Sequence, residues 1–103
     1  MTTLMALYEK PADQAAFDRY YKDNHLPLVR KLPGLKSVAL SKPGLEVLSD
    51  AKHYLVARME FGRVDQAKAA LESAEGVAAA NDLANFADGG VQLVLFDEVV
   101  HVI

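Results

Sequence analysis

The chain of 103 residues contains no cysteine. It therefore forms no disulfide bonds and offers no thiolate to a metal, and a reducing compartment such as the cytoplasm is its expected location. Its formal net charge of -3 argues against a nucleic-acid partner, because affinity for a phosphate backbone comes from clustered Lys and Arg. The sequence also lacks any run of about 18 apolar residues and any basic N-terminal segment followed by an apolar stretch. We therefore expect a cytoplasmic protein with no membrane partner.

The residues that are present make an ordinary globular composition, with 51% hydrophobic and 24% charged residues. The length suits a single domain over residues 1–103. Apolar runs bounded by Pro and Gly predict strands, and apolar residues repeating every 3.6 positions predict helices. The predicted strands cover residues 2–9, 35–41, 52–61 and 91–96, with 97–103 continuing or bending the last one, and the predicted helices cover 14–31 and 66–83.

The helix boundaries carry their own signals. Asp13 and Asp65 are the expected N-caps, because an aspartate side chain can accept hydrogen bonds from the first free N–H groups of a helix. Pro27 should kink or break the first helix, since it has no N–H to donate. Ser73 or Gly76 should break the second. The path of residues 45–51 stays unassigned.

The resulting order, β-α-β-β-α-β, predicts an α+β ferredoxin-like fold, with a four-stranded antiparallel sheet and two helices on one face. The helices can cover only that one face, yet the strands are apolar on both sides: Leu4–Tyr8 is apolar throughout, and Val91–Phe96 has only Gln92 as a polar residue. Packing against the same sheet of a second copy would bury the other face. We therefore expect a homodimer; the alternative is a monomer whose central strands are merely hydrophobic.

Two stretches of the chain resemble the EthD family. The residues that carry the resemblance are Tyr20–Tyr21, His25–Leu26–Pro27–Leu28–Val29 with Leu32–Pro33–Gly34–Leu35, and Ser73 to Asp82 with Asn85–Phe86–Ala87–Asp88. The likeness extends over nearly the whole chain and marks it as a single EthD-like domain. It implies a dimeric α/β barrel with a pocket between each sheet and its helices. It also implies a catabolic role beside an oxidoreductase system, since the family is named from degradation of an ether fuel additive.

His25 is the candidate catalytic residue. It lies at the edge of the buried stripe of the first helix, next to Pro27, where a side chain can face a cavity. An imidazole with an ordinary pKa suits proton transfer near neutral pH. In relatives that resemble methylmuconolactone isomerase, a histidine at this distance before a Pro-Gly pair takes part in the active site. The alternative is a histidine that only ties down the carbonyl groups left free by Pro27.

Aromatic residues near His25 in the expected fold are candidates for substrate binding, above all Tyr8, Tyr21 and Phe86. Such residues can line an apolar pocket and place a polar tip in it. Tyr20 and Tyr54 belong to the same candidate set. The alternative is that all of them are ordinary core residues.

The other polar residues have structural explanations. His53 and His101 are expected to be exposed, and three histidines without metal-ligand spacing predict no metal site. Arg58 is expected to form a structural ion pair, with Glu60 as the candidate partner; the alternative is that it binds an anionic substrate. Asp82 is expected to cap a helical turn or to anchor the connector that follows.

The sequence contains no nucleotide, flavin or phosphate loop, so no cofactor is expected. The preferred hypothesis is a cofactor-independent enzyme, or an accessory protein, acting on a small apolar or aromatic metabolite by isomerisation, cyclisation, decarboxylation or oxygenation. In it, His25 moves a proton. A second hypothesis is a non-catalytic carrier of a hydrophobic small molecule. A third is a purely structural dimer whose pocket is filled by side chains.

Overall fold

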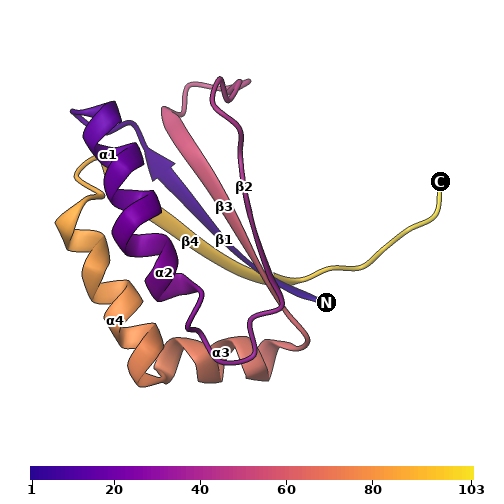
Figure 1. The fold of residues 1–103 in the computed structure, drawn as a ribbon. Coiled ribbons are helices and arrows are strands. Elements are labelled where there is room, and N and C mark those ends of the chain that lie inside the picture. Colours follow the sequence, from indigo (N-terminus) through magenta and orange to yellow (C-terminus); the bar gives the residue numbers. More distant parts are fainter.

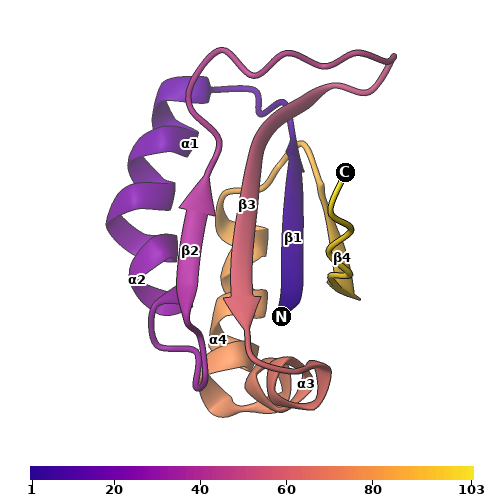
Figure 2. The same ribbon diagram turned by 90° about the vertical axis from the view of Figure 1, so that its right-hand side faces the viewer.

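The four strands form one antiparallel sheet in the order β2-β3-β1-β4 (Figure 2). The computed structural model describes all 103 residues. Its strands are β1 (Thr2–Glu9), β2 (Ser37–Leu40), β3 (His53–Phe61) and β4 (Val91–Asp97). The predicted ferredoxin-like βαββαβ fold is confirmed. Residues 41–52 form the loop whose path the sequence left open, and β4 ends at Asp97, so the residues after it do not continue the strand.

The helical segments lie on one side of this sheet (Figure 1). They are α1 (Gln14–Tyr20), the π-helix η1 (Tyr21–His25), α2 (Leu26–Val29), α3 (Val64–Glu72), α4 (Ala74–Asp82) and the 3₁₀ helix η2 (Leu83–Asn85). In Figure 1, α1, α2 and α4 run along the sheet, while α3 crosses its lower end. None of the helices is long and apolar enough to cross a membrane.

The first helix is not broken at Pro27, because a π-helical turn precedes the proline. Pro27 has no N–H group, so the carbonyl of Asp23 loses its usual helical partner. The chain compensates with the π-helical turn η1, in which the N–H of Leu26 bonds to the carbonyl of Tyr21, five residues back. Helical backbone continues into α2. His25 is the last residue of this turn and is buried, and π-turns of this kind occur frequently at functional sites.

Ser73 makes the corner between α3 and α4. It ends α3, and its hydroxyl accepts a hydrogen bond from the Gly76 N–H at 3.0 Å, which caps the start of α4. Of the two predicted break points, the structure therefore selects Ser73. The predicted N-cap Asp65 is wrong: α3 begins two residues earlier than expected, at Val64 after Arg63, and has no side-chain cap. This corner sets the direction of α4, whose last residue is Asp82.

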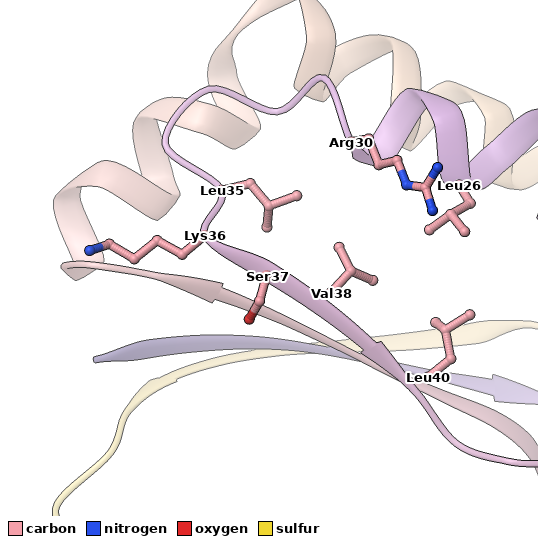
Figure 3. A pocket seen from close by; sticks show the side chains of 7 residues that line it. All are labelled: Leu26, Arg30, Leu35, Lys36, Ser37, Val38 and Leu40. Atoms are coloured by element: carbon pink, nitrogen blue, oxygen red, sulfur yellow. The ribbon is translucent and has the colours of Figure 1, made fainter.

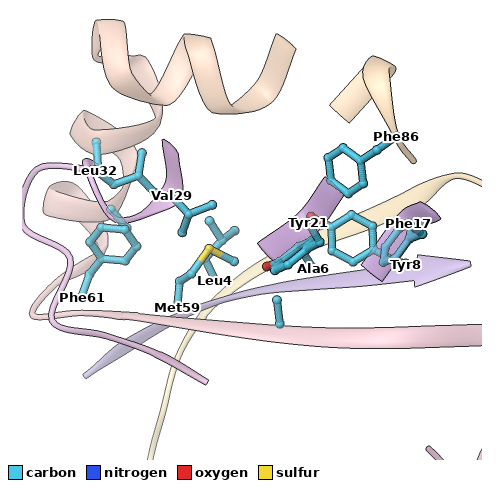
Figure 4. Packing of buried hydrophobic residues seen from close by; sticks show 13 residues of the cluster. Leu4, Ala6, Tyr8, Phe17, Tyr21, Val29, Leu32, Met59, Phe61 and Phe86 are labelled. Carbon is cyan, nitrogen blue, oxygen red and sulfur yellow. The ribbon is translucent and has the colours of Figure 1, made fainter. Parts of the chain in front are cut away.

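The core lies between the helices and one face of the sheet. Leu4, Ala6 and Tyr8 alternate along β1 toward the helices, beside Met59 and Phe61 of β3. The core residues contributed from the helical side are Phe17, Tyr21, Val29, Leu32, Ala67, Ala70 and Phe86. Figure 4 shows two neighbouring groups, one around Met59 that includes Leu4, Val29, Leu32 and Phe61, and an aromatic one around Tyr8. His25 lies against the aromatic group.

The opposite face of the sheet has no cover in the single chain. Pairing with β1 places Met5 next to Arg58 on one side and Val94 on the other, and Val94 is 46% exposed. Arg58 pairs with Glu60 on the same strand at 3.2 Å, as expected. Phe96 adds a large exposed ring to this face. An apolar sheet face of this kind is what a second copy would bury.

We predict that Val94→Lys weakens dimer formation at least about tenfold, since a two-fold interface would contain the unpaired charge twice. Sedimentation equilibrium measures the effect. The matched control is Val77→Lys on α4, where the side chain is 48% exposed but lies in the helical layer. Equal self-association of the two variants would contradict the proposed interface.

A second prediction concerns the α3–α4 corner. A Cβ on Gly76 would lie 2.2 Å from the carbonyl oxygen of Ala70, which is backbone and cannot rotate away. Gly76→Ala should therefore destabilise the fold by roughly 1–3 kcal/mol. A thermal melt should show the midpoint lowered by at least about 5 °C, whereas an unchanged midpoint would show that the corner relaxes freely.

Candidate active site

His25 and Asp82 form a buried pair at the centre of the helical layer. Nδ1 of His25 lies 2.9 Å from Oδ2 of Asp82, and the two residues are only 4% and 8% exposed. They come from η1 and from the end of α4, which lie 57 positions apart in the chain. With the carboxylate at Nδ1, the hydrogen of neutral His25 is held on that nitrogen and the lone pair is left on Nε2.

The other oxygen of Asp82 is held by two further donors. The hydroxyl of Tyr20 donates to Oδ1 at 2.6 Å, and the side-chain amide of Asn85 donates to the same atom at 3.0 Å. Both oxygens of the carboxylate are therefore occupied by hydrogen bonds from the protein. Hydrogen bonds to an ionised acceptor are the strong ones, so this network fixes the carboxylate and, through it, the plane of the imidazole.

The environment favours an ionised Asp82 beside a neutral His25. Burial lowers the pKa of His25, although the hydrogen bond and the charge of Asp82 act in the opposite direction. Burial alone would raise the pKa of Asp82, but hydrogen bonds from Tyr20, Asn85 and His25 outweigh it and hold that pKa below its ordinary value. At neutral pH, Nε2 of His25 is therefore an unprotonated base.

A small cavity reaches this base. Its volume is about 60 Å³, and its lining includes residues of β1, β3, β4 and α4. The lining residues are Leu4, Tyr8, His25, Val29, Leu32, Met59, Leu71, Gly76, Ala79, Ala80, Leu83 and Leu93. No Asp, Glu, Lys or Arg is among them, and the only polar side-chain groups are the imidazole and the Tyr8 hydroxyl.

Tyr8 is the predicted aromatic residue that shares the cavity with His25. Its hydroxyl oxygen lies 3.4 Å from Nε2, a long contact. Burial, together with the nearby Tyr21 and Asp82, raises the pKa of Tyr8 far above its usual value, so this hydroxyl stays protonated. It can therefore donate a hydrogen bond to a molecule bound in front of the imidazole.

Tyr21 and Phe86 surround His25 without lining this cavity. The Phe86 ring centre lies 4.7 Å from that of the imidazole, and the Tyr21 ring centre lies 5.3 Å away. Both side chains belong to the core cluster behind the imidazole (Figure 4). Burial raises the pKa of Tyr21 to about 12. In this chain their contact with His25 is packing, and contact with a substrate stays a prediction.

The remaining candidates lie elsewhere. Tyr54 donates to the carboxylate of Asp18 on α1, away from the imidazole. His53 lies 3.1 Å from Glu9 and is half-buried, and His101 is exposed in the C-terminal tail. No group of three or more His, Asp or Glu side chains lies close enough to hold a metal. A separate hollow of about 400 Å³ lies between α2 and β2 (Figure 3), and His25 does not line it.

The role of Asp82 at this site was not predicted from the sequence. Asp82 was expected to cap a helix or anchor the connector, and its bond to Asn85 fits the second of these roles. Its contact with His25 was missed. A signal was present, because Gly76, Ala79 and Asp82 recur at three-residue spacing on one face of α4 and all are buried. A carboxylate on a buried helix face requires a partner.

Fold and site together define a ferredoxin-like α+β protein with a buried His–Asp pair beside an apolar cavity. The family model of the EthD domain matches residues 9–90. The chain belongs to the EthD family.

Individual relatives agree with this assignment. The chain is 39% identical over 98 residues, 95% of both proteins, to an uncharacterized 11.0 kDa protein in the thcB-thcC intergenic region of Rhodococcus erythropolis. The crystal structure of an EthD family protein from Bacillus halodurans matches with a TM-score of 0.86 and 33% identity, covering 96% of this chain and 99% of that one.

More distant structures share the fold. The cofactor-independent oxygenase SnoaB from Streptomyces nogalater has a TM-score of 0.69 at 16% identity, over 98% of this chain and 95% of that one. A dimeric ferredoxin-like protein of unknown function from Thermobifida fusca has a TM-score of 0.68 at 16% identity, over 92% and 88%. Dimers thus occur among proteins with this fold, in agreement with the uncovered sheet face described above.

The lowered pKa of His25 predicts a pH dependence of stability. In the unfolded chain His25 gains a proton as the pH falls through about 6.5, whereas the folded state resists protonation until a lower pH. Between these two pH values the unfolded state binds more protons than the folded state. The free energy of unfolding should therefore decrease as the pH falls below about 6.5. Asp82, whose pKa is also lowered, should add its own loss only at pH values below about 4.

Urea titrations between pH 7.5 and 5 measure this slope. His25→Asn should flatten it, because the variant has no imidazole at this position to titrate. His101→Asn, which removes an exposed imidazole from the tail, is the control and should retain the slope. A slope that persists in His25→Asn would assign it to another group.

Proposed function

We propose that this protein binds a small apolar metabolite beside His25 and that His25 moves a proton to or from it without a cofactor. The observation that carries the proposal is the hydrogen-bonded pair of His25 and Asp82, 2.9 Å apart, in which His25 lines an apolar cavity and its Nε2 has only a long contact of 3.4 Å, to the Tyr8 hydroxyl. An acid–base pair so oriented contributes typically 10²–10⁴-fold to a proton transfer.

The proposed step keeps the charges of the site balanced. Nε2 of His25 takes a proton from an acidic O–H or from a C–H next to a carbonyl, and the bonding electron pair stays on the substrate as a phenolate or enolate. The imidazolium formed is stabilised by Asp82 through Nδ1. The protonated hydroxyl of Tyr8 is placed to donate to the developing oxyanion, and Nε2 then returns the proton to the same or another atom.

Proton transfer is favoured over simple carriage by the support given to His25. A carrier needs only cavity volume. An aliphatic residue at position 25 would suit a carrier and would avoid the free-energy cost of burying a charged network. Here, Asp82 accepts hydrogen bonds from Tyr20, Asn85 and His25, so the carboxylate that orients the imidazole is itself fixed by two further side chains. SnoaB, a cofactor-independent oxygenase, has the same fold, and the proposal of cofactor-free chemistry rests on the His–Asp geometry.

The test uses 2-tetralone, a neutral ring ketone with acidic C–H groups, dissolved in D₂O. Proton NMR should show faster exchange of these hydrogens for deuterium with the protein than with buffer alone. His25→Asn should reduce the protein-dependent rate at least about 100-fold. Asp82→Asn should reduce it as well, since the imidazole loses the acceptor that selects its tautomer.

Circular dichroism and sedimentation of both variants check that fold and assembly are intact. Exchange at an equal rate in wild type and His25→Asn would contradict proton transfer by His25. Binding of 2-tetralone with no protein-dependent exchange would support the carrier hypothesis instead.

A further inference from the structure

The cavity at His25 has an electrostatic character that restricts what can bind in it. No ionised side chain lines it, and the nearest charge is the carboxylate of Asp82, behind the imidazole. Both oxygens of that carboxylate are already engaged by protein donors. The site therefore holds one buried negative charge and no lysine or arginine to offset a second.

The cations of the chain that could have served an anion are placed elsewhere. Arg58 lies on the opposite face of the sheet and pairs with Glu60. Arg30 and Lys36 line the separate hollow between α2 and β2, together with Leu35 and Val38 (Figure 3). A ligand beside His25 reaches neither of these groups.

Protonation of His25 would not make the cavity suitable for an anion. The imidazolium would be shared between Asp82 and the ligand, so one cation would serve two carboxylates in a region from which water is largely excluded. An unpaired buried carboxylate is strongly disfavoured. From the lining of this cavity we propose that its ligand is uncharged: a phenol, enolisable ketone or similar weak acid that carries no carboxylate.

This inference rests on the proposed function and narrows it, because it excludes decarboxylation and any lactone acid as the reaction or substrate at this site. The acidic group of the ligand meets Nε2 and the Tyr8 hydroxyl, and the rest contacts only apolar side chains such as Leu4 and Leu83. The ligand becomes negatively charged only after Nε2 has taken its proton. At that moment the imidazolium of His25 is present to balance the new charge.

The test compares two phenols, p-cresol and 4-hydroxybenzoate. The substituent opposite the hydroxyl is a methyl group in the first and a carboxylate in the second. Binding is followed by titration calorimetry and by the NMR signal of the His25 imidazole, assigned with His25→Asn. We expect p-cresol to bind and shift this signal, and 4-hydroxybenzoate to bind at least about 100-fold more weakly.

A cation added to the lining of the cavity should reduce the preference for the uncharged phenol. Leu93 lines the cavity on β4 and is 52% exposed, so Leu93→Arg is compatible with the fold. This variant should narrow the difference between the two phenols at least about tenfold. Val77→Arg, with the same added charge at a 48% exposed position that does not line the cavity, should leave the difference unchanged.

The outcomes separate this inference from the function on which it rests. Equal or tighter binding of 4-hydroxybenzoate to the wild-type protein, with a shift of the His25 signal, would overturn the uncharged ligand and leave the proton-transfer site standing. An unchanged difference in Leu93→Arg would overturn the electrostatic explanation. Absence of any effect of either phenol on the His25 signal would remove the ligand site and the proposed function together.

Discussion

The site depends on one buried hydrogen bond, from the imidazole of His25 to the carboxylate of Asp82. A buried carboxylate is unfavourable unless its oxygens have donors, and this one has three, from Tyr20, His25 and Asn85. The same contacts that make Asp82 tolerable in the interior also select the tautomer of His25. The same hydrogen bonds therefore stabilise this part of the fold and hold His25 in the tautomer that proton transfer requires.

Two departures from regular helix bring these groups together. The π-turn before Pro27 places His25 on the inside of the helical layer, and the Ser73 corner with its close approach at Gly76 directs α4 so that Asp82 ends beside it. Neither feature is needed for a ferredoxin-like sheet to form. Both are positions where the chain gives up local regularity, which is where function is often found in a fold.

The two faces of the sheet have different roles. The face toward the helices carries the core and the cavity, and its alternating side chains along β1 reach from Leu4 to Tyr8. The other face is uncovered in the single chain and presents the exposed Val94 and Phe96 beside the Arg58–Glu60 ion pair. Because the cavity is lined from the face of the sheet that carries Leu4 and Tyr8, a second copy packed on the uncovered face would lie on the other side of the sheet from it.

Much of the fold and part of the site could be predicted from the sequence alone, because their signals are local. Apolar runs bounded by Pro and Gly predicted the strands and periodic apolar residues predicted the helices, which gave the βαββαβ order. The lack of clean alternation in the strands predicted a second layer, and His25 was singled out beside Pro27. The partnership of His25 with Asp82 was decided only by tertiary structure, since it joins residues 57 positions apart and depends on the angle at the Ser73 corner. The same holds for Tyr21 and Phe86, which packing turned toward the core, whereas Tyr8 came to face the cavity. The sequence does not show whether such an aromatic ring packs in the core or lines the cavity. That depends on how the helices pack on the sheet.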